Sequence, residues 1–593
     1  MKRLSFGLAL AVVLSGCASL PSSGGAGDQV EIDTHTLLGE IAFERQQTDT
    51  AAQEFLQAAM LSSEPALAER ATRLAHQLEK TDVGLQAAKR WNMLAPSDER
   101  PLWFAGVFET RSNRIDRATE QFTAFMDALG DKRTGFALVL EALADEPYTD
   151  AATAIMRTLN DKFPGVPAGQ YALARLALRS GDFGLALENA KAASDSDANW
   201  LEAQLLYARS LLVAGRTDES LAMGARLAEQ HTEVEVQLQY AELLLSAGKP
   251  RDAEARLNAI LDTNPALPEA IRALAFLAMT EERYDEAKQR FGQLRQDPRY
   301  REEAFYYLGR IAETEKDWLQ ATRSYARVTD GTHAVEAQRR TARIMFVEQG
   351  DQEGAVRHLH DFAEANPRFG ADMLVAQSQL LLQMQRPQEA MQLFDSALAE
   401  NPDDPTLHAA HVQLFVILAQ DASDRGAFDE AETLLDQGLS RYADNSSLRY
   451  SQALLYEEEG KNRKAVDVLA ALVKESPDDP ALLNAYGYLL TDQFDRHKEA
   501  RVYIQKALAK NPDSPAIIDS MGWVLFKLGD YPAAREYLER AYRLEQDPEI
   551  AAHLIDVRLA LGDRDAAVEL LKASLAQHPD DKHLQELGTR IGQ

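Results

Sequence analysis

Small and large apolar residues recur along this chain at a nearly constant spacing. A small residue returns sixteen times, at steps of 33, 34 or 35 residues and one step of 41, at Ala51, Gly84, Ala118, Ala152, Ala186, Ser220, Ala253, Ala287, Ala321, Ala355, Ala390, Ala431, Ala465, Ala500, Ala534 and Ala567. A large apolar residue often follows four positions later, as at Phe55, Phe122, Leu257, Phe291, Tyr325, Phe394, Leu469 and Leu538. Residues four apart share a helical face, so the pattern predicts a buried helix around each small residue.

A second small residue lies about twelve positions before many of these and predicts a partner helix, as at Gly39, Gly106, Gly309 and Gly522. Two helices approach within roughly 8 to 10 Å only where the side chains at the crossing are small. Glycines followed by polar residues predict the turn between the two helices, at Gly181, Gly215, Gly248, Gly350, Gly460, Gly529 and Gly562. Prolines end several units, at Pro96, Pro265, Pro367, Pro402, Pro477, Pro512 and Pro579. The repeating unit is therefore predicted to be a helical hairpin.

A period of about 34 residues resembles that of the tetratricopeptide repeats, in which each hairpin buries its apolar stripe against its neighbours. The predicted fold is all-α, a right-handed superhelical solenoid of about 16 helix-turn-helix units. The 41-residue step between Ala390 and Ala431 inserts about two helical turns around residues 407–425. We expect a longer first helix there, separating an N-terminal array over residues 32–404 from a C-terminal array over residues 405–593.

The N-terminus has the features of a lipoprotein signal. Lys2 and Arg3 precede an apolar run that is too short to span a bilayer, which predicts a signal peptide over residues 1–16. The run ends in Leu14-Ser15-Gly16-Cys17, which resembles a bacterial lipobox, and Cys17 is the only cysteine of the chain. The resemblance implies a lipid on Cys17, and the small, polar residues after it predict a flexible linker over residues 17–31. Ala18 after the cysteine is similar to the sorting signal for the outer membrane of Gram-negative bacteria, which would place the protein there, facing the periplasm.

The net charge of the chain limits the classes of partner that it is expected to bind. There are 93 acidic and 63 basic residues, a formal net charge of −30. Such a chain repels phosphate backbones and anionic head groups, so nucleic acid is not an expected partner, and basic or neutral protein partners are favoured.

No motif predicts catalysis, a metal or a cofactor. The sequence contains no His-Glu-x-x-His, no phosphate-binding loop, no Gly-x-Ser-x-Gly and no dinucleotide fingerprint. His408 and His411 have a spacing that a metal site could use, but no third ligand lies nearby in sequence, so both are expected to be surface or packing residues. The chain is predicted not to be an enzyme.

The repeat geometry predicts where partners bind. In tetratricopeptide arrays the first helices line the concave wall, which implies a partner-binding surface in the last units at Tyr450, Asn484, Tyr488, Asp519, Trp523 and Lys527. Aromatic rings beside an amide and charges suit a peptide segment, because they combine contact area with fixed polar contacts. The alternative is that Tyr488 and Trp523 only pack neighbouring units together.

Three C-terminal strings, at residues 483–488, 517–525 and 547–554, resemble a group of proteobacterial tetratricopeptide lipoproteins. The best-known member of this group is the lipoprotein partner of a periplasmic carboxyl-terminal processing protease. The resemblance implies an adaptor that holds this serine protease and its substrates, hydrolases of peptidoglycan cross-links, together at the outer membrane. In such adaptors the first helices often contact the protease, here residues 34–45.

Two other functions remain open from the sequence. One is a scaffold for envelope polysaccharide export or outer-membrane assembly, which crosslinking to a barrel protein or a deacetylase would reveal. The other is binding of peptidoglycan or another glycan by the concave groove, with Trp523 and Asp519 as a sugar platform. Sedimentation with purified sacculi would test that function.

Overall fold

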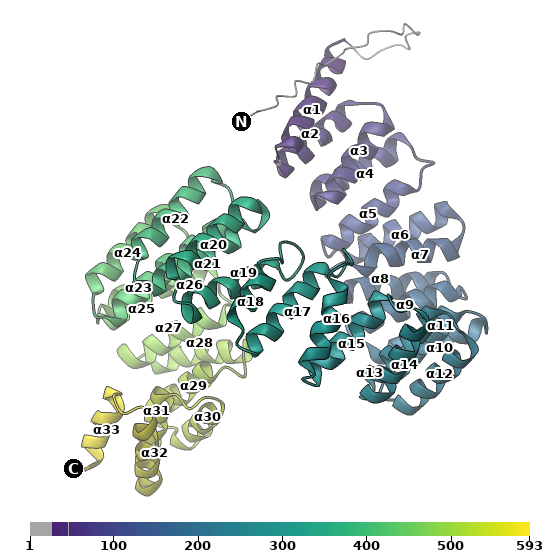
Figure 1. Cartoon of the computed structure of the whole chain (residues 1–593). Coiled ribbons are helices and arrows are strands. Elements are labelled where there is room, and N and C mark those ends of the chain that lie inside the picture. Colours follow the sequence, from purple (N-terminus) through teal and green to yellow (C-terminus); the bar gives the residue numbers. More distant parts are fainter. Residues whose placement is uncertain (1–25, 46, 593) are drawn as a thin grey trace, which may run out of the picture. The chain divides into compact units, whose positions relative to one another are not determined.

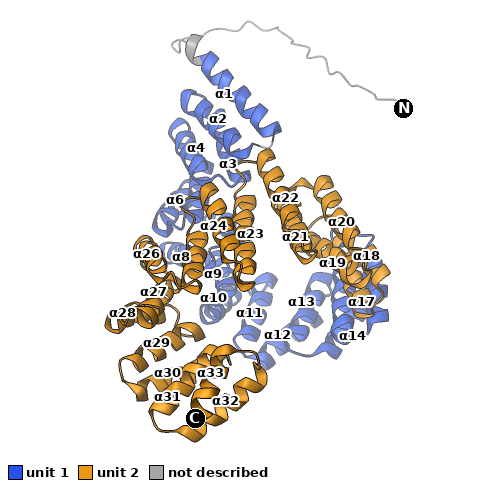
Figure 2. Cartoon of the chain, turned by 90° about the vertical axis from the view of Figure 1, so that its left-hand side faces the viewer, with its two compact units in different colours: residues 1–300 blue, residues 301–593 orange. Residues whose placement is uncertain are grey.

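The computed structural model describes residues 26–45 and 47–592. In this part of the chain, 33 α-helices follow one another without a β-strand (Figure 1). The chain forms two compact units, residues 1–300 and 301–593, which Figure 2 shows in different colours. Each unit is a row of stacked helical hairpins, so the all-α hairpin array expected from the sequence is confirmed.

The helices of the first unit are α1 (Ala26–Glu44), α2 (Thr48–Leu61), α3 (Pro65–Gln77), α4 (Thr81–Leu94), α5 (Arg100–Arg111), α6 (Ile115–Leu129), α7 (Lys132–Ala144), α8 (Thr149–Lys162), α9 (Pro167–Ser180), α10 (Phe183–Ser196), α11 (Leu201–Val213), α12 (Thr217–Gln230), α13 (Val234–Ser246), α14 (Pro250–Thr263), α15 (Pro268–Thr280) and α16 (Tyr284–Leu294). The helices of the second unit are α17 (Arg301–Thr314), α18 (Trp318–Tyr325), α19 (Ala334–Arg343), α20 (Gln352–Ala365), α21 (Gly370–Gln383), α22 (Pro387–Glu400), α23 (Pro405–Asp424), α24 (Phe428–Arg441), α25 (Ser446–Glu458), α26 (Asn462–Glu475), α27 (Pro480–Gln493), α28 (His497–Lys510), α29 (Pro515–Lys527), α30 (Tyr531–Leu544), α31 (Pro548–Ala560), α32 (Arg564–Gln577) and α33 (Lys582–Gly592). A π-helix (Ile344–Glu348) follows α19, and a 3-10 helix (Pro367–Phe369) precedes α21.

The ladder of small residues marks the crossing within each hairpin. Each even-numbered helix from α2 to α32 carries one of the sixteen small residues, and all sixteen are buried. Glycines of the first helix meet the large residue four positions after the ladder residue. A Cβ at Gly106 would lie 2.6 Å from the Phe122 ring, and one at Gly522 would lie 2.5 Å from Leu538 Cγ. Glycine is therefore the residue that allows these helices to pack closely.

The turn between the helices of a hairpin is also as predicted. All seven glycines expected at these turns have φ between 68° and 84°, a left-handed conformation that residues with a Cβ adopt at a cost. This conformation closes the first helix and allows the next helix to begin within two or three residues.

The 41-residue step between Ala390 and Ala431 contains a longer first helix, as expected. Helix α23 has 20 residues, whereas α21 and α25 have 14 and 13. One hydrophobic cluster contains both Leu398 and Leu407, so the core is continuous across the expected array boundary at residues 404 and 405. The compact units instead divide at Tyr300 and Arg301. A functional division of the array at residue 405 stays a prediction.

Helix α1 occupies part of the segment that was predicted to be a flexible N-terminal linker. It begins at Ala26, so residues 26–31 are helical where a flexible linker was predicted. This segment lacks proline, and nothing in it stops the helix that packs on α2 from extending toward the N-terminus. Cys17 and the predicted signal peptide lie outside the described residues. Among the described helices, none combines the length and apolar character needed to cross a membrane.

Candidate functional site

The six residues predicted to bind partners lie on three consecutive first helices of the second unit. Tyr450 lies on α25, Asn484 and Tyr488 on α27, and Asp519, Trp523 and Lys527 on α29 (Figure 1). First helices of neighbouring hairpins pack side by side, so residues about one repeat apart become neighbours. Several of these residues contact side chains outside the predicted set, on α27 and on the next first helix, α31.

Asp519 forms a buried ion pair with a histidine one repeat later. Both carboxylate oxygens of Asp519 lie within hydrogen-bond distance of His553 Nδ1, at 3.0 and 2.9 Å, and 5% of the His553 side chain is exposed. Burial alone would lower the pKa of His553, but Asp519, Glu549 and Asp492 raise it above its usual value. The pair therefore fixes α29 against α31, and Asp519 does not face a free groove as the sequence predicted.

Trp523 is largely covered by its neighbours. Its ring stacks on the His553 ring at a centroid distance of 4.0 Å, and its indole N–H donates to Asp492 Oδ1 over 3.3 Å. Phe526 stacks at 5.1 Å, the Lys527 ammonium lies 4.6 Å from the ring centre, and only 8% of Trp523 is exposed. Trp523 thus packs three first helices together and offers little area to a sugar ring.

Lys527 is the exposed member of the set, and Tyr450, Asn484 and Tyr488 are partly buried. The Tyr488 hydroxyl donates to Glu549 Oε1 over 2.5 Å, and burial followed by the nearby carboxylates raises its pKa. The side-chain oxygen of Asn484 is buried and has no hydrogen-bond partner among the described residues. Tyr450 is partly buried, and burial raises its pKa as well. Tyr450 and Tyr488 thus remain partly accessible, whereas the side-chain oxygen of Asn484 is buried.

Carboxylates outside the six predicted residues also lie on this surface. Glu457 on α25 has a pKa raised to about 7, by burial and then by repulsion from Asp492, Glu549 and Glu458. No ion pair with Lys or Arg is found for Glu457, Asp492 or Glu549 among the described residues. Glu457, Asp492 and Glu549, on α25, α27 and α31, therefore form an acidic wall on this surface. One signal was available in the sequence: Glu457 and Asp492 lie 35 residues apart, each eight positions before the small residue of its unit, Ala465 or Ala500.

The histidines considered as metal ligands are packing residues. The Nδ1 atoms of His408 and His411 lie 3.2 and 3.1 Å from the Tyr442 hydroxyl. His411 is fully buried and stacks on Phe394 at 5.5 Å, and burial lowers its pKa to about 4. In the described part of the chain, no group of three His, Cys, Asp or Glu residues is arranged to hold a metal ion.

Comparison with known proteins identifies the repeat. One family model described as tetratricopeptide repeat matches residues 244–307 and 525–591. A second model with the same description matches residues 171–233, 346–405, 418–480 and 450–515, and together the two models cover more than half of the chain. The chain is a tetratricopeptide-repeat protein. Tetratricopeptide repeats form protein-binding scaffolds that are generally without catalytic activity, and the matches indicate no enzyme family.

This tetratricopeptide-repeat protein is similar to several known proteins. It is 27% identical over 521 residues to the TPR repeat-containing protein PA4667 of Pseudomonas aeruginosa, covering 87% of this chain and 81% of the relative. Among solved structures, it matches the thermophilic TPR protein TTC0263 of Thermus thermophilus with 23% identity and a TM-score of 0.28, over 30% of this chain and 98% of that chain. It matches the APC/C hetero-tetramer Cut9-Hcn1 with 15% identity and a TM-score of 0.33, over 94% and 96% of the two chains.

Proposed function

We propose that this tetratricopeptide-repeat protein is a non-catalytic adaptor that holds a periplasmic carboxyl-terminal processing protease together with its substrates, hydrolases of peptidoglycan cross-links. The proposal includes a lipid on Cys17 and a place at the outer membrane of a Gram-negative bacterium, facing the periplasm. Holding two partners on one scaffold replaces a bimolecular encounter by a local one and raises their effective concentration toward about 1 mM.

The observation that carries the proposal is an apolar stripe on α1. Val30, Leu37 and Ile41 are 66%, 61% and 40% exposed, and Leu38 beside them is 44% exposed. The spacing of seven and four residues places Val30, Leu37 and Ile41 on one face of the helix. Terminal helices of repeat arrays are usually polar on the outer face, because no further repeat covers them. An apolar outer face therefore supports a partner that docks on α1, where the resemblance places the protease.

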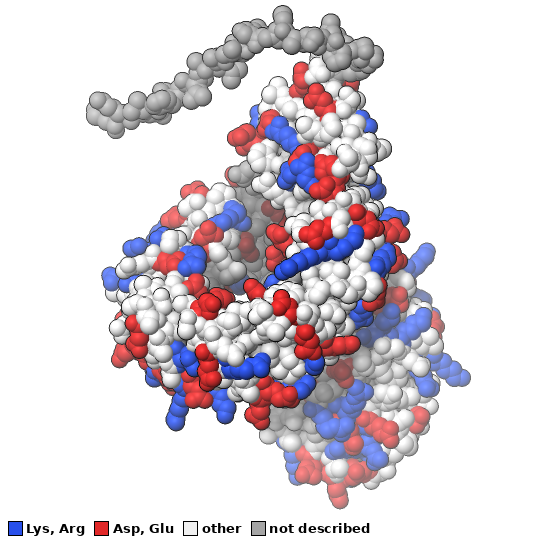
Figure 3. All heavy atoms as spheres, turned by 90° about the vertical axis from the view of Figure 1, so that its right-hand side faces the viewer, with Lys and Arg blue, Asp and Glu red and all other residues white. Residues whose placement is uncertain are grey.

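The acidic wall of Glu457, Asp492 and Glu549 on α25, α27 and α31 supports a second partner. It lies on other helices than the stripe, so the two partners would not compete for the same residues. Its unpaired carboxylates favour a basic segment of a substrate. Figure 3 shows that on the face it draws, acidic and basic side chains are interspersed with uncharged areas, so charge does not gather there in one block. The covered ring of Trp523 disfavours the glycan-platform alternative.

The α1 stripe can be tested by capture of the protease. We expect the triple variant Val30→Ser, Leu37→Ser and Ile41→Ser to recover at least about tenfold less protease from a membrane fraction, since three apolar contacts are lost. The double variant Leu319→Ser and Val502→Ser is the matched control, because these residues are 57% and 53% exposed at other sites. Equal capture by the triple variant and the control would contradict the proposal. Recovery of a barrel protein or a deacetylase instead of the protease would favour an export or assembly scaffold.

A further inference from the structure

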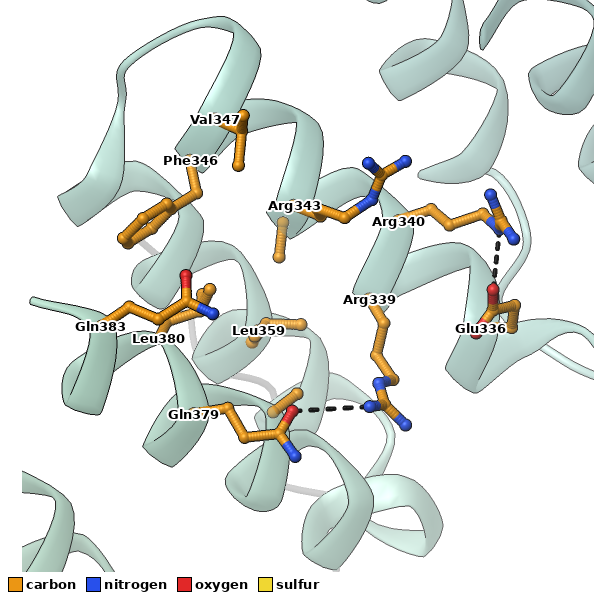
Figure 4. A pocket seen from close by; sticks show the side chains of 12 residues that line it. Glu336, Arg339, Arg340, Arg343, Phe346, Val347, Leu359, Gln379, Leu380 and Gln383 are labelled. Atoms are coloured by element: carbon orange, nitrogen blue, oxygen red, sulfur yellow. Dashed lines mark hydrogen bonds and ion pairs between the residues drawn. The ribbon is translucent and has the colours of Figure 1, made fainter. Parts of the chain in front are cut away.

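A second candidate binding surface lies in the second unit, between α19, the π-helix and α21. It is a pocket of about 420 Å³ with α20 at its floor (Figure 4). Leu359 and Leu380 form the apolar base, and Phe346 and Val347 lie at one end. Ala376 also lines the pocket. Three arginines of α19 line the side opposite α21, at positions 339, 340 and 343.

The arginines leave a positive charge that nothing around the pocket neutralises. Arg340 and Arg343 both pair with Glu313, which also accepts a hydrogen bond from the Tyr325 hydroxyl, and Arg340 Nε lies 2.7 Å from Glu336. Among the described residues, the only hydrogen-bond partner found for the Arg339 guanidinium is the neutral Gln379 side chain, at 3.4 Å (Figure 4). Three arginines thus face two glutamates, in a chain whose net charge is −30.

The π-helix shapes the other end of the pocket. Its wide turn is seen in the backbone, where the N–H of Gln349 donates to the carbonyl of Ile344 five residues earlier, over 3.0 Å. The turn leaves Val347 61% exposed near the arginines, although Val347 is large and apolar. π-Helical turns cost stability and occur frequently at functional sites. Neither packing between the helices nor the proposed docking of a partner on α1 explains why Val347 is exposed.

We infer that this pocket binds an acidic amphipathic segment of a protein partner, with a side-chain carboxylate on Arg339 and a large apolar side chain between Phe346, Val347 and Leu380. A guanidinium binds a carboxylate through two parallel hydrogen bonds, which gives both strength and orientation. An apolar base beside that charge supplies the contact area that a neutral polar segment could not use. The pocket and the acidic wall on α25 to α31 therefore select segments of opposite charge. The inference rests on the protein-binding function of the repeats but not on the identity of the protease.

The test is a calorimetric titration of the full-length protein with designed peptides. The probe is a helical peptide of about 14 residues, long enough to be partly helical, with Glu and Leu on one face and both ends blocked by acetylation and amidation. The neutral comparison is the same peptide with Gln at each Glu. At about 50 mM salt we expect the acidic peptide to bind and the neutral peptide not to bind. The acidic peptide should bind more weakly at about 300 mM salt, because salt screens the ion pair.

Variants locate the binding. Arg339→Gln should weaken the acidic peptide about tenfold and Val347→Ser about fivefold, whereas Arg463→Gln, the same charge change at an exposed arginine of α26, should leave it within about twofold. Circular dichroism of each variant shows whether the fold is kept. Equal binding of the neutral peptide, full affinity in Arg339→Gln, or binding only of a peptide with a free C-terminal carboxylate would overturn the inference. Protease capture through α1 is measured separately, so either proposal can fail alone.

Discussion

At the scale of single residues, the acidic wall contains carboxylates that are partly buried and lie close to one another, an arrangement that the core of a compact domain rarely contains. Glu457 is partly buried and faces Asp492 and Glu549, so its carboxylate loses hydration and is repelled by like charges. Nothing within the described part of the chain repays this cost with an ion pair. A group kept in such a place costs stability, which is consistent with a role in binding a positively charged partner.

Replacing Glu457 tests this balance through the pH dependence of stability. Its pKa is raised to about 7, so the folded chain holds a proton between pH 4.5 and 7 that the unfolded chain releases. Stability therefore falls as pH rises through this window, and the loss is complete above it. We expect Glu457→Gln to stabilise α25 and α27 by about 1 to 3 kcal/mol at pH 8 and by much less at pH 4. Native-state hydrogen exchange of variant and parent at each pH measures the difference.

The control for this change is Glu569→Gln, which alters an exposed glutamate of α32. Its effect should stay within about 0.5 kcal/mol at both pH values, as for most surface substitutions. If Glu457→Gln destabilises the helices at pH 8, the carboxylate makes a favourable contact and the wall is not prepared for a cation.

At the scale of helices, the close crossing within each hairpin was predictable from the sequence because it depends on one small residue. Gly522 illustrates this, since a Cβ there would lie 2.5 Å from Leu538 Cγ and 3.2 Å from the Ala534 carbonyl oxygen. We expect Gly522→Ala to destabilise the hairpin of α29 and α30 by about 1 to 3 kcal/mol, because the two helices must separate. Urea unfolding followed by circular dichroism and by hydrogen exchange in α29 measures this loss.

Gly184→Ala is the matched control for that prediction. Gly184 is also helical, but the nearest atom to an added Cβ is 3.8 Å away, on the Asp182 side chain. Alanine should therefore be neutral there or stabilising by up to about 1 kcal/mol, through its higher helix propensity. A similar loss of stability in both variants would show that the glycines do not set the helix spacing.

Other features could not be predicted from the sequence, because the residues that produce them do not recur in every repeat. The π-helix at Ile344–Glu348 adds no residue that breaks the 34-residue step from Ala321 to Ala355, so the ladder gives no sign of it. The candidate site shows the same limit. Tyr450, Asn484 and Asp519 lie on first helices as the periodicity predicts, but the partner of Asp519 depends on which side chain lies one repeat further, here His553.

At the scale of the whole chain, stability is the sum of many interfaces between neighbouring hairpins. Most contacts of a hairpin are with the helices before and after it, and the hydrogen bond from Tyr488 on α27 to Glu549 on α31 reaches one hairpin further, so disruption at one end should spread a short distance. The C-terminal end has such a boundary: Leu584, Leu587 and Ile591 of α33 belong to the cluster that covers Leu570 and Leu571 of α32. Helix α33 thus packs its apolar residues on α32.

Removal of α33 tests whether the array behaves in this way. A chain that ends at residue 580 exposes the apolar face of α32, so we expect faster hydrogen exchange in α31 and α32, while α25 and α27 exchange at the parent rate. Replacing Lys582 by Gln within α33 is the control, because it keeps the apolar contacts of the helix. Faster exchange throughout α17 to α32 after truncation would mean that the second unit unfolds as one cooperative body. The acidic wall and the arginine pocket would then be coupled through folding, and partners bound at the two sites would stabilise each other.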